Sequence, residues 1–475
     1  MHKERTLLDE KRKQDEKRIR MTTQPHEKLI FKLAIPSIIS MLITSFYNLV
    51  DTFFVGQLEN TSATGAVGVC FSIMAIIQAF GFFFGHGSGN YISRELGKKN
   101  IKGAEEMASV GFFSAIIVGI TIMVFGLIFL KPLAKLLGST DSILPYAVDY
   151  LRYILIGAPF TCGLFVINNQ LRFQSNALFS MIGVVSGAVI NVILDPILIF
   201  GCNMGVAGAA LATIISQALS AVWVLRFLTG KRVLIPLTIK KVRISRTITK
   251  DILRLGASNF IMQGTNCLVQ VICNSTLQNY GGDIYVGIMT VANSVREIFM
   301  LPISGIVNGA QPVISFNYGA KAYGRVKDGI RFNTWIGTVY TMFAWLLVLA
   351  IPKFWFQMFS DDVQMLDAGV QALKIYFFGF VFMSLQFAGQ STFQALGDAK
   401  HAIFFSLLRK AIIVVPLTML LPAVGFGVNG VFLAEPISNI IGGIACYVTM
   451  RMTIYRKLCS QSQDNEIHFS GYSKK

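Results

Sequence analysis

Long apolar segments alternate with short polar ones along almost the whole chain. Segments of about 20 apolar residues, the length at which a helix crosses a bilayer, recur twelve times. They cover residues 29–55, 63–88, 108–130, 144–170, 179–201 and 206–228 in the first half, and 252–277, 284–312, 331–352, 367–394, 402–421 and 428–450 in the second. The pattern predicts an all-α polytopic membrane protein with twelve transmembrane helices, short loops and two tails.

The polar segments divide the chain into lobes and tails. Residues 1–28 are densely charged with mixed sign and carry no apolar core of the signal-peptide type, so we expect a disordered or surface-lying cytoplasmic tail. Residues 229–251 form the one long basic connection, and they lie at the midpoint of the chain. We therefore expect an N-terminal lobe at 29–228, a cytoplasmic basic linker, a C-terminal lobe at 252–450 and a cytoplasmic tail at 451–475.

The two lobes are copies of one repeat. Moving the second half against the first by 222 residues, without a gap, places Gly97 on Gly319 and the sequence GVAGAALA at 205–212 on GVNGVFLA at 427–434. One shift that holds across about 180 residues points to duplication. Each lobe has six helices, an even number, so both copies share one orientation. Transporters built from such parallel repeats handle their substrate at the interface of the repeats and work by rocking one against the other.

Composition and charge change this interpretation little, but they exclude other classes. The chain is 53% hydrophobic and 14% charged, and it has 38 Phe but five His among 475 residues, which is more apolar surface than a soluble domain needs. The net charge of +17 would suit nucleic acid, but the basic residues collect in every second loop. That asymmetry predicts both termini in the cytoplasm. We expect a monomer, integral to the plasma (cytoplasmic) membrane, with no nucleic-acid partner.

Two acids lie within the apolar segments, Asp51 near the end of the first span and Asp195 near the end of the fifth. A carboxylate inside a membrane costs at least about 2.5–3.5 kcal/mol on insertion scales, so such residues are rare and mostly functional. The repeat places Asp51 on Cys273 and Asp195 on Leu417, so the scaffold does not require either acid. The acids therefore suggest a special role for the N-terminal lobe.

Further polar residues share the level of these acids. At 1.5 Å per residue along a helix, Asp51, Asp195 and Thr213 of the sixth span lie about 6–10 Å below the outer boundary. Asn191 lies one turn from Asp195, and Asn48 lies three residues before Asp51, so each amide shares a face with its acid. Such a set can share a proton, because two close carboxylates do not readily ionise together, or it can offer oxygen ligands to a small cation. The alternative is that each acid caps a helix end or contacts water at the boundary.

Five segments together resemble one known family. They are LAIPSIISMLITSFYNLVDTFFVGQL, GSGNYISRELGKKN, NVILDPILIFG, GVAGAALATIISQ and FNYGAKAYGRVKDG. Through them the chain, from about residue 26 onward, resembles the multidrug and toxic compound extrusion (MATE) transporters, closest to the bacterial DinF-like and MepA-like branch. The resemblance implies two six-helix lobes around a central cavity. It also implies export of drugs or metabolites, and we expect cationic or amphiphilic ones, against inward movement of a cation, H⁺ in preference to Na⁺.

The resemblance assigns roles to particular residues. It implies that Asp51, Asn191, Asp195 and Thr213 form a cation site in the N-terminal lobe, and that Pro36 marks the bend of the first helix. Apart from the coupling ion, H⁺ or Na⁺ at this site, we expect no cofactor and no metal. We also expect no enzyme activity.

The second lobe departs from the branch of the family that binds its ion there. That branch has acids in the seventh and tenth spans, whereas here neither span has one in its interior, and Asp367 stands only at the start of the tenth. The second lobe instead has Arg296 and Glu297 in the eighth span, and Glu435 in the twelfth at the repeat position of Thr213. We expect Arg296 to form a structural ion pair with an acid. Alternatively, Glu297 or Glu435 helps to bind a cationic substrate.

Other chemistry has weaker support. His86 is a candidate proton carrier, but its repeat partner is Asn308, and Gly87 is matched by Gly309, which favours close packing. The seven cysteines show no CxxC spacing, so no disulfide or metal framework is predicted. An intramembrane enzyme would need a nucleophile and base or a metal cluster at one depth, and no HExxH or GxSxG motif occurs. A lipid-linked precursor flippase of the wider superfamily is the alternative function, although extra helices and a more cationic cavity would be expected of it.

Overall fold

The structure of the protein is a computed structural model, and it describes residues 12, 15–58, 60–228, 235, 237, 246–359 and 363–461. Within these residues the chain is almost entirely helical and contains no strand, so the predicted all-α class is confirmed. Most of the predicted basic linker and the end of the C-terminal tail lie outside the described residues.

The helices follow the apolar segments. The first half contains α2 (His26–Gly56), α3 (Thr61–Gly97), α4 (Ile101–Ile128), α5 (Leu130–Leu136), α6 (Leu144–Phe173), α7 (Ala177–Pro196), η1 (Ile197–Gly201) and α8 (Val206–Leu228). The long helix α9 (Arg246–Gly319) begins the second half. It is followed by α10 (Tyr323–Ala350), α11 (Pro352–Gln357), α12 (Val363–Phe377), η3 (Phe380–Phe382), α13 (Met383–Leu396), α14 (Ala399–Leu407), η4 (Leu408–Val414), α15 (Val415–Leu421), η5 (Pro422–Phe426), α16 (Gly427–Met450) and η6 (Arg451–Tyr455).

Ten helical stretches among the described residues are long and apolar enough to span a membrane. Two of these stretches each contain two helices. The stretch Ile248–Gly319 is interrupted at Gly282, where φ is 71°, and the stretch Ala399–Gln461 is interrupted at Gly425, where φ is 108°. Glycine adopts positive φ without the steric cost of a side chain, so the chain can turn at these two positions. When each double stretch is counted as two helices, the described part of the chain contains the twelve membrane helices that the apolar pattern predicts.

The internal repeat is visible in the backbone. The first residues of α4 and α10 lie 222 positions apart, as do their last residues and the last residues of α3 and α9. Residues at positive φ recur at the same spacing: Lys99 and Lys321 at 65° and 57°, and Gly205 and Gly427 at 54° and 52°. The predicted duplication is therefore confirmed in the positions where helices end and loops turn.

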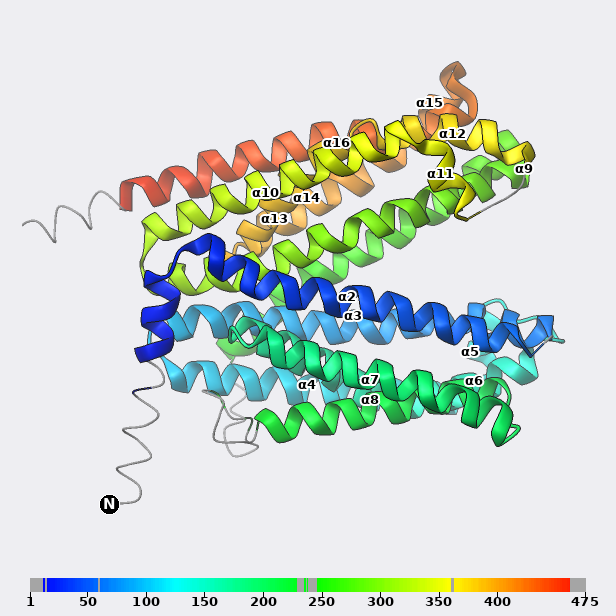
Figure 1. Cartoon of the computed structure of the whole chain (residues 1–475), viewed down its shortest axis with the longest axis horizontal. Helices are drawn as coiled ribbons and strands as arrows, with labels where there is room; N and C mark the ends of the chain where they lie inside the picture. Colours follow the sequence, from blue (N-terminus) through cyan, green and yellow to red (C-terminus); the bar gives the residue numbers. More distant parts are fainter. Residues whose placement is uncertain are drawn as a thin grey trace, which may run out of the picture. The chain divides into compact units, whose positions relative to one another are not determined.

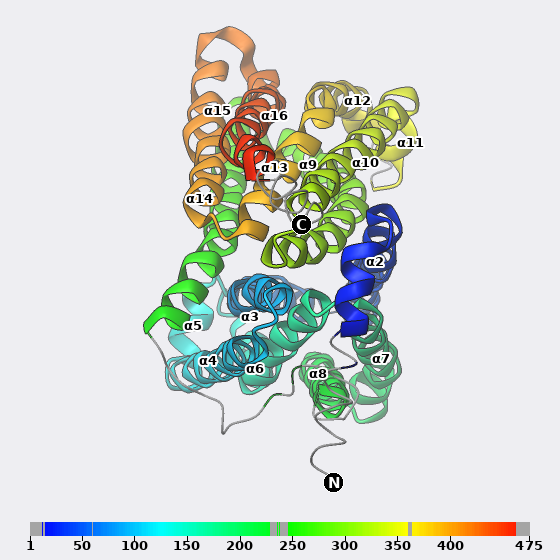
Figure 2. The same ribbon diagram turned by 90° about the vertical axis from the view of Figure 1, so that its left-hand side faces the viewer.

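The chain forms two compact units, one comprising Met1–Arg20 and Ile35–Phe260 and the other Met21–Ala34 and Ile261–Lys475. In the first unit, α6 contacts α3, α4, α7 and α8, and these helices run side by side (Figures 1 and 2). In the second, α16 contacts α12, α13 and α15. Two boundaries of the units fall inside α2 and α9 and none falls at the predicted linker, so the beginning of each of these two helices belongs to the other unit.

The charged N-terminal segment is better ordered than the sequence suggested. Residues 15–23 are helical, and Met21 is fully buried. Asn317 donates a hydrogen bond from Nδ2 to the carbonyl oxygen of Met21 at 3.2 Å, and Arg325 donates to the carbonyl oxygen of Gln24. Polar side chains of the second unit thus hold this backbone in place, and Met21 is the only buried residue among 21–28, so the structure leaves the surface-lying alternative and not the disordered one for this stretch.

Two repeat-related glycines allow close helix packing. A Cβ atom at Gly87 would lie 2.7 Å from the carbonyl oxygen of Ile252, and a Cβ atom at Gly309 would lie 2.5 Å from the backbone nitrogen of Ala34. Atoms cannot approach so closely without moving the backbone. The close packing predicted for this pair of glycines is confirmed.

Replacement of Gly309 by alanine is expected to destabilise the protein. The added methyl group must push α2 and α9 apart, and overpacking of this kind costs about 1–3 kcal/mol. The midpoint of thermal unfolding in detergent should fall for Gly309→Ala and for Gly87→Ala. Gly264→Ala is the matched control, because nothing lies within 4 Å of a Cβ atom there. Equal midpoints for Gly309→Ala and Gly264→Ala would contradict the packing argument.

Candidate functional site

Three of the four predicted cation-site residues meet in the first unit. Asn191 and Asp195 lie one turn apart on α7, and Asn191 donates from Nδ2 to Asp195 Oδ1 at 3.2 Å. The same amide nitrogen donates to Thr213 Oγ1 on α8 at 3.4 Å. All three residues are buried, and Asp195 is fully so. The amide thus links a carboxylate on one helix to a hydroxyl on the next.

Asp51 on α2 approaches this group without a direct hydrogen bond to it among the described residues. Tyr47, one turn before Asp51 on the same face of α2, hydrogen-bonds to Gln217 of α8 and lines the same cavity as Asn191 of α7 and Thr213 of α8. The face of α2 that carries Tyr47 and Asp51 is therefore directed toward α7 and α8.

The second unit shows the same approach of two helices at the repeat positions. Cys273 Sγ and Thr418 Oγ1 lie 3.7 Å apart. By the spacing of 222 residues, these two correspond to Asp51 and to Pro196, which directly follows Asp195. The repeat therefore brings the first and fifth helices of each lobe together at this level. In the first unit, one of the two corresponding positions is Asp51, and the other directly follows Asp195.

A small cavity adjoins the site. It has a volume of about 70 Å³, and it lies between α2, α6, α7 and α8. Its polar lining residues are Thr44, Tyr47, Asn168, Asn191, Thr213, Ser216, Gln217 and Ser220. A single water needs roughly 10–15 Å³ by this measure, whereas pockets for drug-sized ligands measure about 300–1,000 Å³. The cavity has room for a few waters or a small hydrated ion, but not for an organic compound.

Three oxygens at the site accept no hydrogen bond from any described residue. They are Asp51 Oδ1, Asn191 Oδ1 and Asp195 Oδ2, and all three are buried. A buried polar atom without a partner costs about 1–3 kcal/mol, and more when it is charged. A proton on a carboxylate or a cation among these oxygens would remove that cost.

The remaining residues predicted for the first lobe are placed as follows. Pro36 lies inside α2, two residues beyond the point at which the helix passes from the second unit to the first. The side chain of Asn48 lies outside the described part of the structure. His86 packs against the rings of Phe82 and Phe173, with centroid distances of 5.8 and 5.9 Å. These aromatic contacts give His86 a packing role, and no acid of the cation site contacts it among the described residues.

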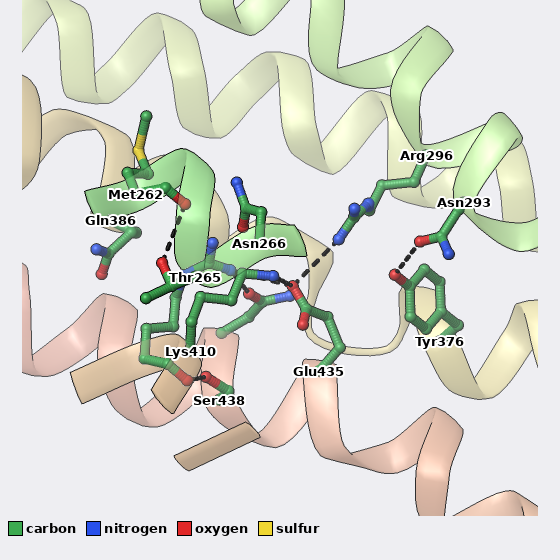
Figure 3. A network of polar contacts seen from close by, with 12 residues as sticks. Met262, Thr265, Asn266, Asn293, Arg296, Tyr376, Gln386, Lys410, Glu435 and Ser438 are labelled. Carbon is green, nitrogen blue, oxygen red and sulfur yellow. Dashed lines mark hydrogen bonds and ion pairs between the residues drawn. The ribbon is translucent and has the colours of Figure 1, made fainter. Parts of the chain in front are cut away.

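A charged cluster occupies the second unit (Figure 3). Glu435 Oε1 accepts hydrogen bonds from Arg296 at 3.2 Å, from Arg409 at 3.1 Å and from Lys410 at 2.7 Å. The predicted ion pair of Arg296 is therefore confirmed. Glu297 is 65% exposed and lies 3.7 Å from Arg296. Glu435 does not fit the alternative role in binding a cationic substrate, because three cations already surround its carboxylate.

Arg409 and Lys410 were not predicted from the sequence. They stand side by side in the apolar segment LLRKAIIVV, and two adjacent basic residues in a membrane span are as unusual as an acid there. Their repeat positions hold Gly187 and Ala188, so the comparison of the two lobes that set Asp51 and Asp195 apart would have set these residues apart as well.

The fold and the buried acids define a membrane transporter built from two parallel repeats. The MatE family matches the chain at residues 36–197 and 260–420, one match in each repeat. The chain belongs to this family.

Individual relatives agree with that assignment. The chain is 28% identical over 406 residues to the multidrug export protein MepA of Staphylococcus haemolyticus, across 85% of this chain and 88% of the relative. It is 26% identical to MepA of Staphylococcus aureus strain MSSA476, across 93% of this chain and 96% of the relative. In fold it is similar to a MOP superfamily transporter from Pyrococcus furiosus, with a TM-score of 0.87 at 23% identity, across 94% of this chain and 98% of that one. The predicted MepA-like MATE transporter is thus confirmed.

Proposed function

We propose that the protein is a multidrug exporter that couples the export of organic, cationic or amphiphilic compounds to the inward movement of a cation. The names of the MepA relatives support multidrug export and give no support to a lipid-linked precursor flippase. The observation that carries the coupling proposal is the group of three buried oxygens without donors on Asp51, Asn191 and Asp195. Asn191 also lines, together with Thr213, a cavity that is too small for an organic compound.

Protons are the coupling ion that this geometry favours over Na⁺. The amide nitrogen of Asn191, not its oxygen, contacts both Asp195 and Thr213. An N–H group directed at these two oxygens opposes a metal ion between them, whereas a proton can bind to the free Asp195 Oδ2 or Asp51 Oδ1 without disturbing the amide. Uptake of one proton by the two acids also relieves the repulsion between their charges.

The transport cycle follows from the repeat. We expect alternating access, as in other transporters built from parallel repeats. The basic residues in every second loop support an orientation with both termini in the cytoplasm. Protons then enter the site from the outer side, and their release to the cytoplasm resets the transporter.

Gradient-driven efflux from proteoliposomes tests the coupling ion. Ethidium efflux by the wild-type protein should respond to an imposed pH gradient and not to a sodium gradient alone. Asp51→Asn should lose most of the response, because an amide cannot exchange a proton. Asp149→Asn, which changes an exposed acid of α6 in the same unit, should behave like the wild type. Full gradient-driven transport by Asp51→Asn would show that Asp51 is not part of the coupling site.

A further inference from the structure

The charged cluster of the second unit has more positive than negative charge. Arg296, Arg409 and Lys410 share the single carboxylate of Glu435, and one positive charge remains even when the exposed Glu297 is counted. Unbalanced charge within a membrane span is costly. The cluster is therefore incomplete as a structural ion pair.

The two arginines of the cluster are less completely buried than Lys410 and Glu435. The side chains of Lys410 and Glu435 are only 4% and 6% exposed, and their contact at 2.7 Å is the shortest in the cluster. The side chains of Arg296 and Arg409 are 19% and 11% exposed. Figure 3 shows Arg296 reaching toward Glu435 from α9, with Lys410 on the other side of the carboxylate. Lys410 and Glu435 thus form an inner pair, and the side chains of the two arginines are more exposed than this pair.

Neutral side chains also contact the guanidinium groups of Arg296 and Arg409. These contacts supply no negative charge. Arg409 donates to the amide oxygen of Asn439 at 2.8 Å, and Arg296 lies over the ring of Tyr376, 5.7 Å from its centroid. Arg296 Nε is buried and has no hydrogen-bond partner among the described residues. A donor of this kind fits an oxyanion, since the planar guanidinium group can donate two parallel hydrogen bonds to a carboxylate or phosphate.

The repeat shows that the scaffold does not need these cations. In the first unit, Arg296, Arg409 and Lys410 correspond to Met74, Gly187 and Ala188. All three of these line small cavities beside the cation site. The second unit therefore has a cluster of basic side chains at the repeat positions that line small cavities in the first unit.

We propose that Arg296 and Arg409 form an oxyanion-binding site in the second unit, which takes the carboxylate or phosphate group of an amphiphilic ligand. The inner pair of Lys410 and Glu435 holds the two guanidinium groups in position. The proposal deepens the proposed function, on which it rests, because it extends the substrate class from cations to zwitterions and anions. The occupant is a transported organic anion or a lipid headgroup, which share this chemistry.

Binding of two xanthene dyes tests the site without any ion gradient. Fluorescence anisotropy of the anion fluorescein and of the cation rhodamine 123 would be measured with the purified full-length protein in a neutral detergent. Arg296→Gln and Arg409→Gln should each weaken fluorescein binding by about tenfold. Loss of one hydrogen bond to a charged group lowers affinity by about this factor. Arg296→Lys should give an intermediate loss, because it keeps the charge but not the planar fork. Arg451→Gln, which removes an exposed cation of η6 in the same unit, is the control and should bind fluorescein like the wild type.

Competition identifies the source of the oxyanion. Displacement of fluorescein by benzoate would indicate an organic carboxylate, and displacement by dioctanoyl phosphatidylglycerol but not by the matching phosphatidylcholine would indicate a lipid headgroup. The proposal is wrong if the Arg296 and Arg409 variants bind fluorescein as the wild type does, or if they lose both dyes equally. Because no gradient is applied, this outcome is independent of the Asp51→Asn efflux result, so failure of the anion site and failure of cation coupling are distinguishable.

Discussion

Replacement of Asp195 by asparagine is expected to abolish gradient-driven export while leaving the fold intact. Asparagine has nearly the same shape, and its side-chain oxygen can accept the hydrogen bond that Asn191 now donates to Asp195 Oδ1. It cannot take up or release a proton, and it places an N–H group where the unpartnered Oδ2 now lies. Coupling free energies between sites are about 1–3 kcal/mol, or about 5- to 150-fold. Ethidium efflux under a pH gradient should therefore fall by about tenfold or more.

Thermal unfolding separates this loss from damage to the protein. Asp195 is fully buried, and removal of a buried charge that lacks full compensation is neutral or stabilising. The unfolding midpoint of Asp195→Asn should equal or exceed that of the wild type, while efflux is lost. A lower midpoint together with lost efflux would point to a structural role for Asp195. Retention of full gradient-driven efflux would remove Asp195 from the coupling site.

Replacement of Glu435 by glutamine is expected to destabilise the second unit strongly. It leaves Arg296, Arg409 and Lys410 around a neutral side chain, within contacts of 2.7–3.2 Å that now hold them together. Loss of one partner from a buried ion pair costs about 3–5 kcal/mol, because the remaining charge is not compensated. At about 2–4 °C for each kcal/mol in a unit of this size, the thermal unfolding midpoint should fall by about 10 °C.

Two further variants isolate the electrostatic cause. Glu297→Gln removes an acid that is 65% exposed and 3.7 Å from Arg296, and exposed pairs contribute about 0–1 kcal/mol, so its midpoint should hardly change. The double variant Glu435→Gln with Lys410→Met should recover part of the lost stability, because it removes one of the unbalanced charges. If the double variant were less stable than Glu435→Gln alone, mutual repulsion of the cations would not be the cause.

The membrane helices could be predicted closely because length and hydropathy are local properties. Predicted spans such as 144–170 and 206–228 agree with α6 (Leu144–Phe173) and α8 (Val206–Leu228) within a few residues. The helices extend further at polar ends, as where α3 continues to Gly97, since hydropathy detects the part of a helix that suits lipid and not the helical turns beyond it. The order of the N-terminal segment could not be predicted for a related reason: its charges suggest solvent, and the contacts that hold its backbone come from Asn317 and Arg325, far along the chain.

Part of the candidate site could also be predicted from the sequence. The four-residue spacing of Asn191 and Asp195 on one helix places their side chains on one face, and the structure joins them by a hydrogen bond. Thr213 was assigned through depth and resemblance, and its contact with Asn191 agrees. Tyr47 and Gln217 were not foreseen, because a hydroxyl and an amide within an amphipathic pattern carry no signal of their own.

The sequence by itself determined the class of fold, the duplication and the presence of two acids that the scaffold does not require. Those conclusions depend on hydropathy, on spacing along one helix and on the comparison of two copies, all of which can be read along the chain. Only the tertiary structure decided which charges neutralise one another. Arg296, Lys410 and Glu435 lie on three different helical segments, α9, η4 and α16, and Coulomb interactions depend on distance in space. That distance is fixed by helix packing and not by sequence spacing, and it is the reason that the oxyanion site is apparent only in the folded protein.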